Sequence, residues 1–350
     1  MSAPTITSRH RPLREVPDKE WLALWQEPVI EPELPIVDPH HHLIDFPRWR
    51  YLFDDFSADI ATGHNIRATV FLQWYLGYRT DGPKALRPVG ETEFASGVAS
   101  MSESRPYGNP RVCTGIVGYA DFTLGTAVEA VLEAHLEAGR KHFRGIRHVG
   151  AHDPCEVFAS RMLAPPGLYL DARFRQGFAC LSRYDLSFDA WLFHPQIQEL
   201  TSLARAFPQI PIVLDHVGGP LGLGAYADRR QEIFEVWHAS IRKLADCPNV
   251  WIKLGGLGMR LPGFDFSEQP IPPSSADLAA AWRPYIETCI EVFGTKRAMF
   301  ESNFPVDKIS CSYPVLWNAF KRIAASYSAE EKADLFAGSA ARFYRLNVDT

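Results

Sequence analysis

The chain has 350 residues, of which 46% are hydrophobic and 22% are charged, and its formal net charge is -5. This composition is that of an ordinary globular protein and excludes a disordered or fibrous chain. The charge balance lacks the basic excess of a nucleic-acid-binding protein, so the expected partner is a small-molecule substrate. The sequence contains no apolar run of about 18 residues and no signal-peptide pattern at its start. We therefore expect a cytoplasmic protein with no nucleic-acid or membrane partner.

Short apolar runs alternate with longer amphipathic stretches along the chain. Eight runs have the pattern of strands, and they begin at Pro35, Asn65, Arg111, His142, Leu186, Ile210, Asn249 and Lys296. Helical periodicity is clearest in residues 125–139, 196–207, 228–245 and 277–294. This alternation predicts a single-domain α/β fold, a (β/α)₈ TIM barrel over residues 35–350, with residues 1–34 as an N-terminal extension packed on the barrel.

A doubly wound Rossmann-type sheet is the second fold that such alternation could give. That fold needs a glycine-rich turn directly after an early strand. The glycine-rich segments LGLG at Leu221 and LGGLG at Leu254 come late in the chain, so the pattern favours the barrel.

Long connections follow several of the predicted strands, over residues 77–110, 150–180 and 255–275. The loops after barrel strands form the active-site mouth, so these segments are expected to shape a substrate pocket, although plain surface insertions would look the same in sequence. Trp74 and Trp191 lie at predicted strand ends and are candidates for an aromatic substrate wall.

Histidines gather at the carboxyl ends of the predicted strands. His40 and His42 end the first run, and His148, His194 and His216 end three later ones. Side chains two apart on a strand share a face, so Asp38, His40 and His42 are predicted to project to one side. Two imidazoles on one face suit a divalent transition metal, although a buried hydrogen-bonded cluster is a simpler interpretation.

Five segments, taken in order, resemble the strand motifs of the amidohydrolase superfamily. They are DPHHHLID at Asp38, FRGIRH at Phe143, IVLDHVGG at Ile212, WIKLGGLG at Trp251 and MFESNFPV at Met299. The resemblance is closest to the amidohydrolase-related (amidohydrolase 2) branch, which contains lactonases and decarboxylases, and it spans residues 35 to 345. It implies a TIM-barrel enzyme that binds a divalent metal, with zinc favoured over manganese or iron, and family analogy suggests a homodimer.

The resemblance also implies roles for individual residues. His40 and His42 match the pair that binds a divalent metal or helps to polarise the substrate. His216 matches a position that binds metal or polarises a substrate carbonyl, and His194 matches one that binds metal or contacts substrate. Where better-known relatives carry a metal-bridging lysine on the fourth strand, this chain has Arg144, Arg147 and His148. These three residues are candidate binding groups for a substrate carboxylate.

The eighth predicted strand departs from the family pattern. Relatives have an aspartate there that serves as metal ligand and general base, whereas this chain has Asn303. An amide cannot accept a proton from water near neutral pH, so another group must serve as base. Glu301, two residues earlier, is a candidate metal ligand and catalytic group, and a structural ion pair with Lys253 would also explain it. Asp307 could supply a carboxylate from the following loop.

The leading hypothesis is a metal-dependent hydrolase of a small cyclic ester or related carbonyl compound. A dinuclear non-haem iron or manganese monooxygenase is a second hypothesis, because Glu301 together with several histidines could hold two redox metals. The same motifs would also fit a metal-dependent decarboxylase or a barrel without catalytic activity, because one fold hosts many reactions.

Overall fold

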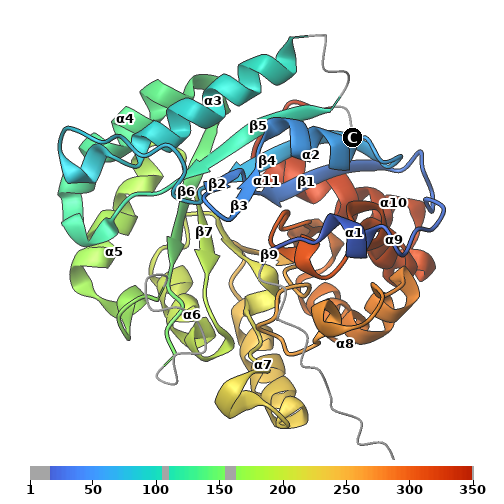
Figure 1. The fold of residues 1–350 in the computed structure, drawn as a ribbon. Helices are drawn as coiled ribbons and strands as arrows, with labels where there is room; N and C mark the ends of the chain where they lie inside the picture. Colours follow the sequence, from blue (N-terminus) through green and yellow to red (C-terminus); the bar gives the residue numbers. More distant parts are fainter. Residues whose placement is uncertain (1–15, 105–109, 154–162, 349–350) are drawn as a thin grey trace, which may run out of the picture.

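The computed structural model describes residues 16–104, 110–153 and 163–348. Eight parallel strands form its central sheet (Figure 1), and each strand pairs with the next one in the sheet. In sheet order they are β1 (Pro35–His41), β4 (Asn65–Leu72), β5 (Arg111–Gly118), β6 (Phe143–Val149), β7 (Ser187–Trp191), β8 (Ile212–Leu214), β9 (Val250–Leu254) and β10 (Ala298–Phe300). Every strand overlaps one of the eight predicted runs, so the predicted TIM barrel is confirmed.

The barrel closes where the chain beyond β10 meets the end of β1. The backbone N–H of Asn303 donates to the carbonyl of His40 at 2.9 Å, and that of His42 donates to the carbonyl of Phe304 at 2.7 Å. His41 and Phe304 form a parallel bridge. Closure therefore brings the H-x-H segment directly beside the segment that contains Glu301 and Asn303.

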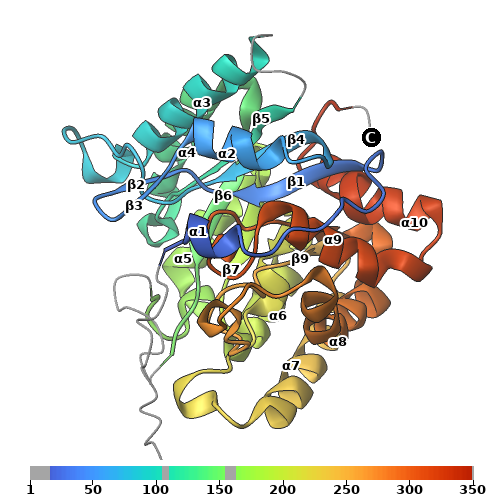
Figure 2. The same ribbon diagram turned by 45° about the vertical axis from the view of Figure 1, so that its right-hand side comes forward.

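Helices surround the strands in both views (Figures 1 and 2). They are α1 (Lys19–Leu22), α2 (Phe53–Ile60), α3 (Val89–Glu103), α4 (Glu129–Gly139), α5 (Ala172–Ala179), α6 (Ile197–Ala206), α7 (Arg230–Ala245), α8 (Ser275–Phe293), α9 (Tyr313–Ile323), α10 (Ala329–Ala333) and α11 (Ser339–Phe343). A small antiparallel hairpin of β2 (Ile44–Phe46) and β3 (Trp49–Tyr51) follows β1. Within the described residues, no helix is both long and apolar enough to cross a membrane.

Two of the predicted long loops contain helices. Helix α3 lies within residues 77–110 and α5 lies within residues 150–180, so the connections are shorter than expected. The α3 sequence VGETEFASGVASMSE buries small side chains such as Ala95 and Ala99. Small residues give a weak apolar period, so the sequence pattern does not reveal this helix. Residues 154–162 of the second segment lie outside the described part of the chain.

The segment before β1 runs along α9 (Figure 1). Asn318 of α9 accepts a hydrogen bond from the Ile30 backbone N–H and donates to the carbonyl of Pro28, both at 2.8 Å. The ammonium of Lys321 donates to the carbonyls of Ile30 and Glu31. These contacts attach residues 27–31 to the outer helices.

The barrel interior is apolar at its amino-terminal end. Side chains from strands on opposite sides form one cluster there with the C-terminal segment: Val37, Ala68, Val70, Leu72, Val117, Val213, Met299, Ala337, Ala340, Phe343, Tyr344 and Leu346. The C-terminal segment therefore closes this end of the barrel, and charged side chains begin only above the cluster.

Candidate metal centre and active site

The first strand brings His40 and His42 to the barrel interior. Their Nε2 atoms lie 3.1 Å apart, and the ring of His42 lies 4.6 Å from that of Trp74. The strand register shifts between Asp38 and His41, which breaks the simple alternation. Asp38 instead accepts hydrogen bonds from Ser302 and from the Tyr313 hydroxyl, both at 3.0 Å. The prediction that Asp38 shares the histidine face is therefore wrong, because an irregular strand does not keep period two.

Glu301 holds two of the histidines. Its Oε2 lies 2.8 Å from Nδ1 of His40, and its Oε1 lies 2.7 Å from Nδ1 of His216. Burial disfavours the charged carboxylate, but the charge of His216 and the hydrogen bonds from the two rings lower the pKa of Glu301 to about 2. Glu301 is therefore an anion at neutral pH.

The β9 end leaves room for this pair because it has no side chains there. A Cβ atom on Gly255 would lie 2.4 Å from Cγ of Glu301, and one on Gly256 would lie 2.4 Å from Cβ of His216. Gly256 also has a φ of +69°, which favours glycine. The LGGLG segment thus has a packing role at this site.

The donor set suits a divalent cation. Nitrogen and oxygen donor atoms of His40, His216 and Glu301 lie within 4.8 Å of one another, and all three residues are buried. The Nδ1 of His42 faces the carbonyl of Leu72 at 2.9 Å, and a carbonyl only accepts. His42 therefore carries its proton on Nδ1 and presents a lone pair on Nε2. Nδ1 of His216, opposite a carboxylate, leaves Nε2 of that ring available in the same way.

Arg147 enters the barrel from β6. Its Nη1 lies 3.4 Å from Nε2 of His40, and its Nη2 donates to the carbonyl of Gln73 at 2.6 Å. Among the described residues, no carboxylate forms an ion pair with this buried guanidinium. Arg147 is therefore placed to receive an anionic oxygen from a bound molecule.

Asn303 and Asp307 form a pair beside the β9 loop. The Asn303 amide donates to Oδ1 of Asp307 at 2.7 Å, and the Gly258 N–H donates to Oδ2 at 2.9 Å. Burial raises the pKa of Asp307 to about 7, although the charge of His216 and these two hydrogen bonds oppose the shift. Asp307 can therefore exchange a proton near neutral pH.

Several predicted site residues lie away from this cluster. His148 faces the outer layer, where its ring is 5.2 Å from that of Phe174. Arg144 is half-buried lower on β6 and donates to the carbonyl of Phe143. His194 accepts from the Leu221 N–H at 3.3 Å, and burial lowers its pKa to about 4. Trp191 packs in a separate apolar cluster with Leu221, Phe193, Met259, Leu261 and Ala151.

A set of charges below the histidines was not predicted from the sequence. Lys253 of β9 is fully buried, and its ammonium lies 2.7 Å from Asp189 and 2.9 Å from Asp215. The Tyr344 hydroxyl donates to the same Asp189 oxygen that Lys253 contacts. The sequence did contain a sign of this pair, because the apolar runs SFDAW and VWIKL each include one charged residue. A charge that is buried in a strand requires a partner of opposite charge.

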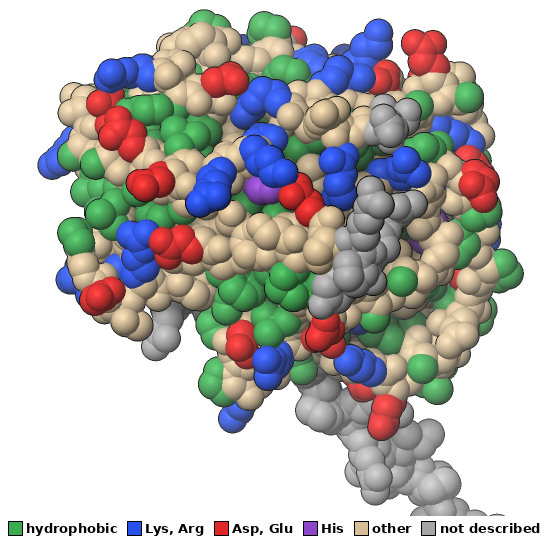
Figure 3. Space-filling model, turned by 90° about the horizontal axis from the view of Figure 1, so that it is seen from above, with side chains coloured by type: hydrophobic (Ala, Val, Ile, Leu, Met, Phe, Trp, Pro, Cys, Tyr) green, Lys and Arg blue, Asp and Glu red, His purple; other side chains and the backbone are tan. Residues whose placement is uncertain are grey.

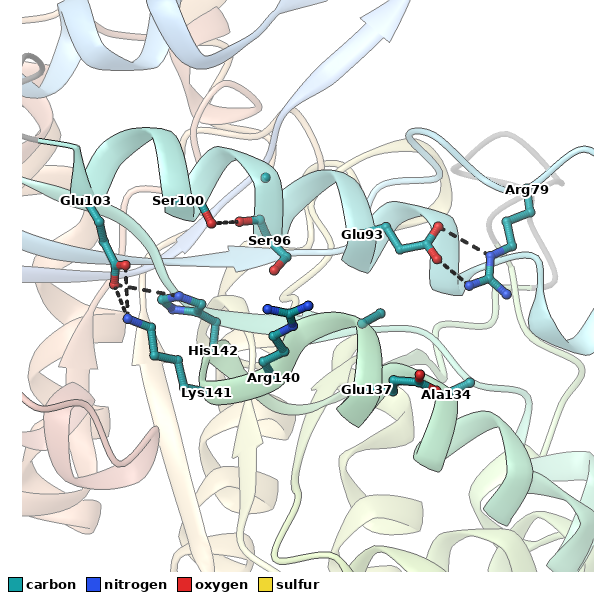
Figure 4. A pocket seen from close by; sticks show the side chains of 12 residues that line it. Arg79, Glu93, Ser96, Ser100, Glu103, Ala134, Glu137, Arg140, Lys141 and His142 are labelled. Carbon is teal, nitrogen blue, oxygen red and sulfur yellow. Dashed lines mark hydrogen bonds and ion pairs between the residues drawn. The ribbon is translucent and has the colours of Figure 1, made fainter.

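A polar groove on the outer wall, between α3 and α4, is a separate feature (Figure 4). Arg79 pairs with Glu93 at one end, and Lys141 pairs with Glu103 at 2.9 Å at the other. The face seen in Figure 3 likewise intersperses basic and acidic side chains. These charges neutralise one another, so the barrel interior remains the candidate active site.

Comparison with known proteins identifies the family. The model of the amidohydrolase family matches residues 37–346. The chain belongs to this family. It is 35% identical to the uncharacterized protein y4mH of Sinorhizobium fredii, over 90% of this chain and 99% of that protein. It is 28% identical to L-fucono-1,5-lactonase of Burkholderia multivorans, over 89% of this chain and 96% of that enzyme.

A solved structure resembles the whole barrel of this amidohydrolase. It is an amidohydrolase from Burkholderia multivorans with bound zinc, 25% identical, which covers 89% of this chain and 99% of its own with a TM-score of 0.66. This chain is therefore a hydrolase of the amidohydrolase family. Its candidate site for a divalent metal consists of the buried residues His40, His216 and Glu301.

Proposed function

We propose that this amidohydrolase is a metal-dependent hydrolase of a small lactone that carries an anionic group. The observation that carries the proposal is the buried carboxylate of Asp307, which accepts a hydrogen bond from the Asn303 amide and so lies beside the position of the lost base. Burial raises the pKa of Asp307 to about 7, which suits a general base. The 28% identity to a lactonase supports the choice of a cyclic ester. Zinc is the favoured metal, because the donors are imidazoles and a carboxylate.

His40 and His216 would hold the metal through their Nε2 atoms, with the Nε2 of His42 beside them, while Glu301 would support both rings from the Nδ1 side. When bound, a divalent metal supplies Lewis-acid polarisation of the ester carbonyl and lowers the pKa of water. Glu301 fixes both Nδ1 atoms, so the two rings keep their orientation before substrate arrives.

Asp307 acts as the general base for hydrolysis. One of its carboxylate oxygens takes a proton from water as the water oxygen bonds to the ester carbon, and the ring C–O bond then breaks. That proton passes to the departing ring oxygen, and the carboxylic acid formed at the other end releases the second proton of the water to solvent, so the products are an alcohol, a carboxylate and one free proton. The Asn303 amide and the Gly258 N–H keep the carboxylate in place during this exchange.

Arg147 and Trp74 position the substrate. The Arg147 guanidinium donates one hydrogen bond to the carbonyl of Gln73, and its other N–H groups would bind an anionic oxygen of the substrate. The indole beside His42 offers an apolar surface to the lactone ring.

The test is a screen of neutral and carboxylate-bearing lactones, in which acid release is followed with a pH indicator. Protein depleted of metal with a chelator is compared with the same protein after addition of Zn²⁺ or Mn²⁺. We expect hydrolysis that depends on metal and is lost in His40→Ala and His216→Ala. Hydrolysis at full rate in metal-depleted protein would contradict the metal dependence, and no hydrolysis of any lactone would contradict the substrate class.

A further inference from the structure

A side chain of the outer helix α3 holds the segment that follows β4. Oε1 of Glu91 accepts hydrogen bonds from the backbone N–H groups of Trp74 at 2.6 Å and of Leu76 at 2.9 Å. Glu91 is 1% exposed, so it cannot itself contact a substrate. Loss of this one oxygen would leave two backbone donors without a partner, which is costly away from water. Glu91 therefore fixes residues 74–76 from outside the barrel.

The backbone of this segment has a conformation that its surroundings must impose. Tyr75, between the two donors, has a φ of +66°, a left-handed value that a residue other than glycine rarely adopts. The first turn of α3 also lies directly against the segment, because a Cβ atom on Gly90 would be 2.3 Å from the carbonyl oxygen of Gly77. The start of α3 and the segment thus fit together without space for a side chain.

Three successive residues at the start of this segment contact groups of the site. The carbonyl of Leu72 accepts from Nδ1 of His42 at 2.9 Å, and the carbonyl of Gln73 accepts from Nη2 of Arg147 at 2.6 Å. The Trp74 ring lies 4.6 Å from that of His42. The orientations of the guanidinium and of the indole therefore depend on where this backbone lies.

We propose that Glu91 is a positioning residue for the substrate: by fixing residues 74–76 it sets the positions of Arg147 and Trp74, although it touches no substrate itself. The inference rests on the proposed function and deepens it, because in that function Arg147 binds the anionic group of a lactone. Selectivity for such a lactone then depends on an oxygen at position 91 that reaches both N–H groups. The reach of this oxygen matters more than the charge of the side chain.

The experiment compares kcat and KM of zinc-loaded wild type and variants on one carboxylate-bearing lactone and one neutral lactone. Glu91→Asp keeps the charge but is shorter by one methylene, so its carboxylate should not reach both N–H groups. We expect KM for the carboxylate-bearing lactone to rise about tenfold with kcat nearly unchanged, and a much smaller effect on the neutral lactone, because the weakened interaction is a binding one. Equal losses on both lactones would indicate a merely structural role and would overturn the inference.

Glu91→Gln is the conservative variant. It removes the charge but keeps an oxygen in the place of Oε1, so it should retain the wild-type selectivity. A loss as large as that in Glu91→Asp would mean that Glu91 acts through its charge, and it would overturn the inference. The matched control is Glu93→Asp, because Glu93 lies on the same helix but is exposed and pairs with Arg79. This variant should leave both KM values unchanged, and an equal shift in it would contradict a specific role of Glu91.

Amide hydrogen exchange tests the same contact without a substrate. In peptides that cover residues 73–78, Glu91→Asp should exchange faster than the wild type, and Glu91→Gln should not. Equal exchange in the wild type and Glu91→Asp would overturn the inference. A wild type that hydrolyses no lactone would contradict the proposed function and with it the role toward the substrate. Exchange that still depends on position 91 would then show that the failure lies in the function and not in the contact.

Discussion

At the scale of single residues, Asp307 determines how activity should vary with pH. Burial disfavours its charged form and raises its pKa to about 7, and a general base works only in that charged form. Lactone hydrolysis should therefore be high above pH 7 and fall as the pH drops through it. Asp307→Asn should lower kcat/KM by about 10²- to 10⁴-fold and abolish this pH dependence. The measurement is kcat/KM between pH 5 and 9.

Two further variants test the assignment of that titration to Asp307. Asn303→Ala removes the amide that donates to the carboxylate, so the midpoint should move to higher pH. Asp185→Asn removes an exposed carboxylate and should leave the profile unchanged. If Asp307→Asn kept the wild-type profile, the base would have to be another group.

Arg147 should select for anionic lactones. Its guanidinium is buried and has no ion pair within the described chain, so the substrate supplies the counter-charge. Arg147→Met should lower kcat/KM about 100-fold for a carboxylate-bearing lactone and much less for a neutral one. Arg144→Met, on the same strand but away from the cluster, is the matched control. Equal losses on both lactones would contradict a role in charge recognition.

Residue-level prediction from the sequence depended on which residues stand at the carboxyl ends of parallel strands. His40, His42, His216, Glu301 and Arg147 meet in the barrel because their strands end at one rim. The sequence suggested Lys253 only as an ion-pair partner of Glu301. In the structure it pairs with Asp189 and Asp215, which come from other strands and could not be identified as its partners from sequence spacing. His148 was misplaced for a different reason, since alternation could not say which face of β6 points inward.

At the scale of elements, all eight strands could be predicted from apolar runs and helical intervals. The β2–β3 hairpin could not, because three-residue strands such as Ile44–Phe46 carry too few positions to show a period. The register shift between Asp38 and His41 in β1 could not be predicted either. It depends on how β1 pairs with β4 and with the segment beyond β10, and the sequence of β1 alone does not contain that information.

The C-terminal segment should contribute to stability because it packs against the amino-terminal end of the barrel. Phe343 is 3% exposed, packs 5.3 Å from the Trp251 ring and closes the amino-terminal end of the barrel. Phe343→Ala should lower the free energy of unfolding by about 3–5 kcal/mol, measured by denaturant titration. Val236→Ala, at a position 50% exposed, should change it by less than about 0.5 kcal/mol. A loss below about 1 kcal/mol for Phe343→Ala would show that this end is loosely packed.

At the scale of the whole molecule, the candidate metal centre joins β1, β8 and the segment after β10, three parts of the chain that closure brings together. A metal that binds only the folded barrel stabilises it by mass action, by about 2.7 kcal/mol at a free concentration 100 times the Kd. Added Zn²⁺ should therefore raise the Tm of metal-depleted protein by several degrees, as measured by calorimetry. His216→Ala should abolish the rise, whereas His142→Ala, in the outer groove, should preserve it. An equal rise in both variants would place the bound metal outside the barrel, because His216 contacts Glu301 inside the barrel whereas His142 lies in the outer groove.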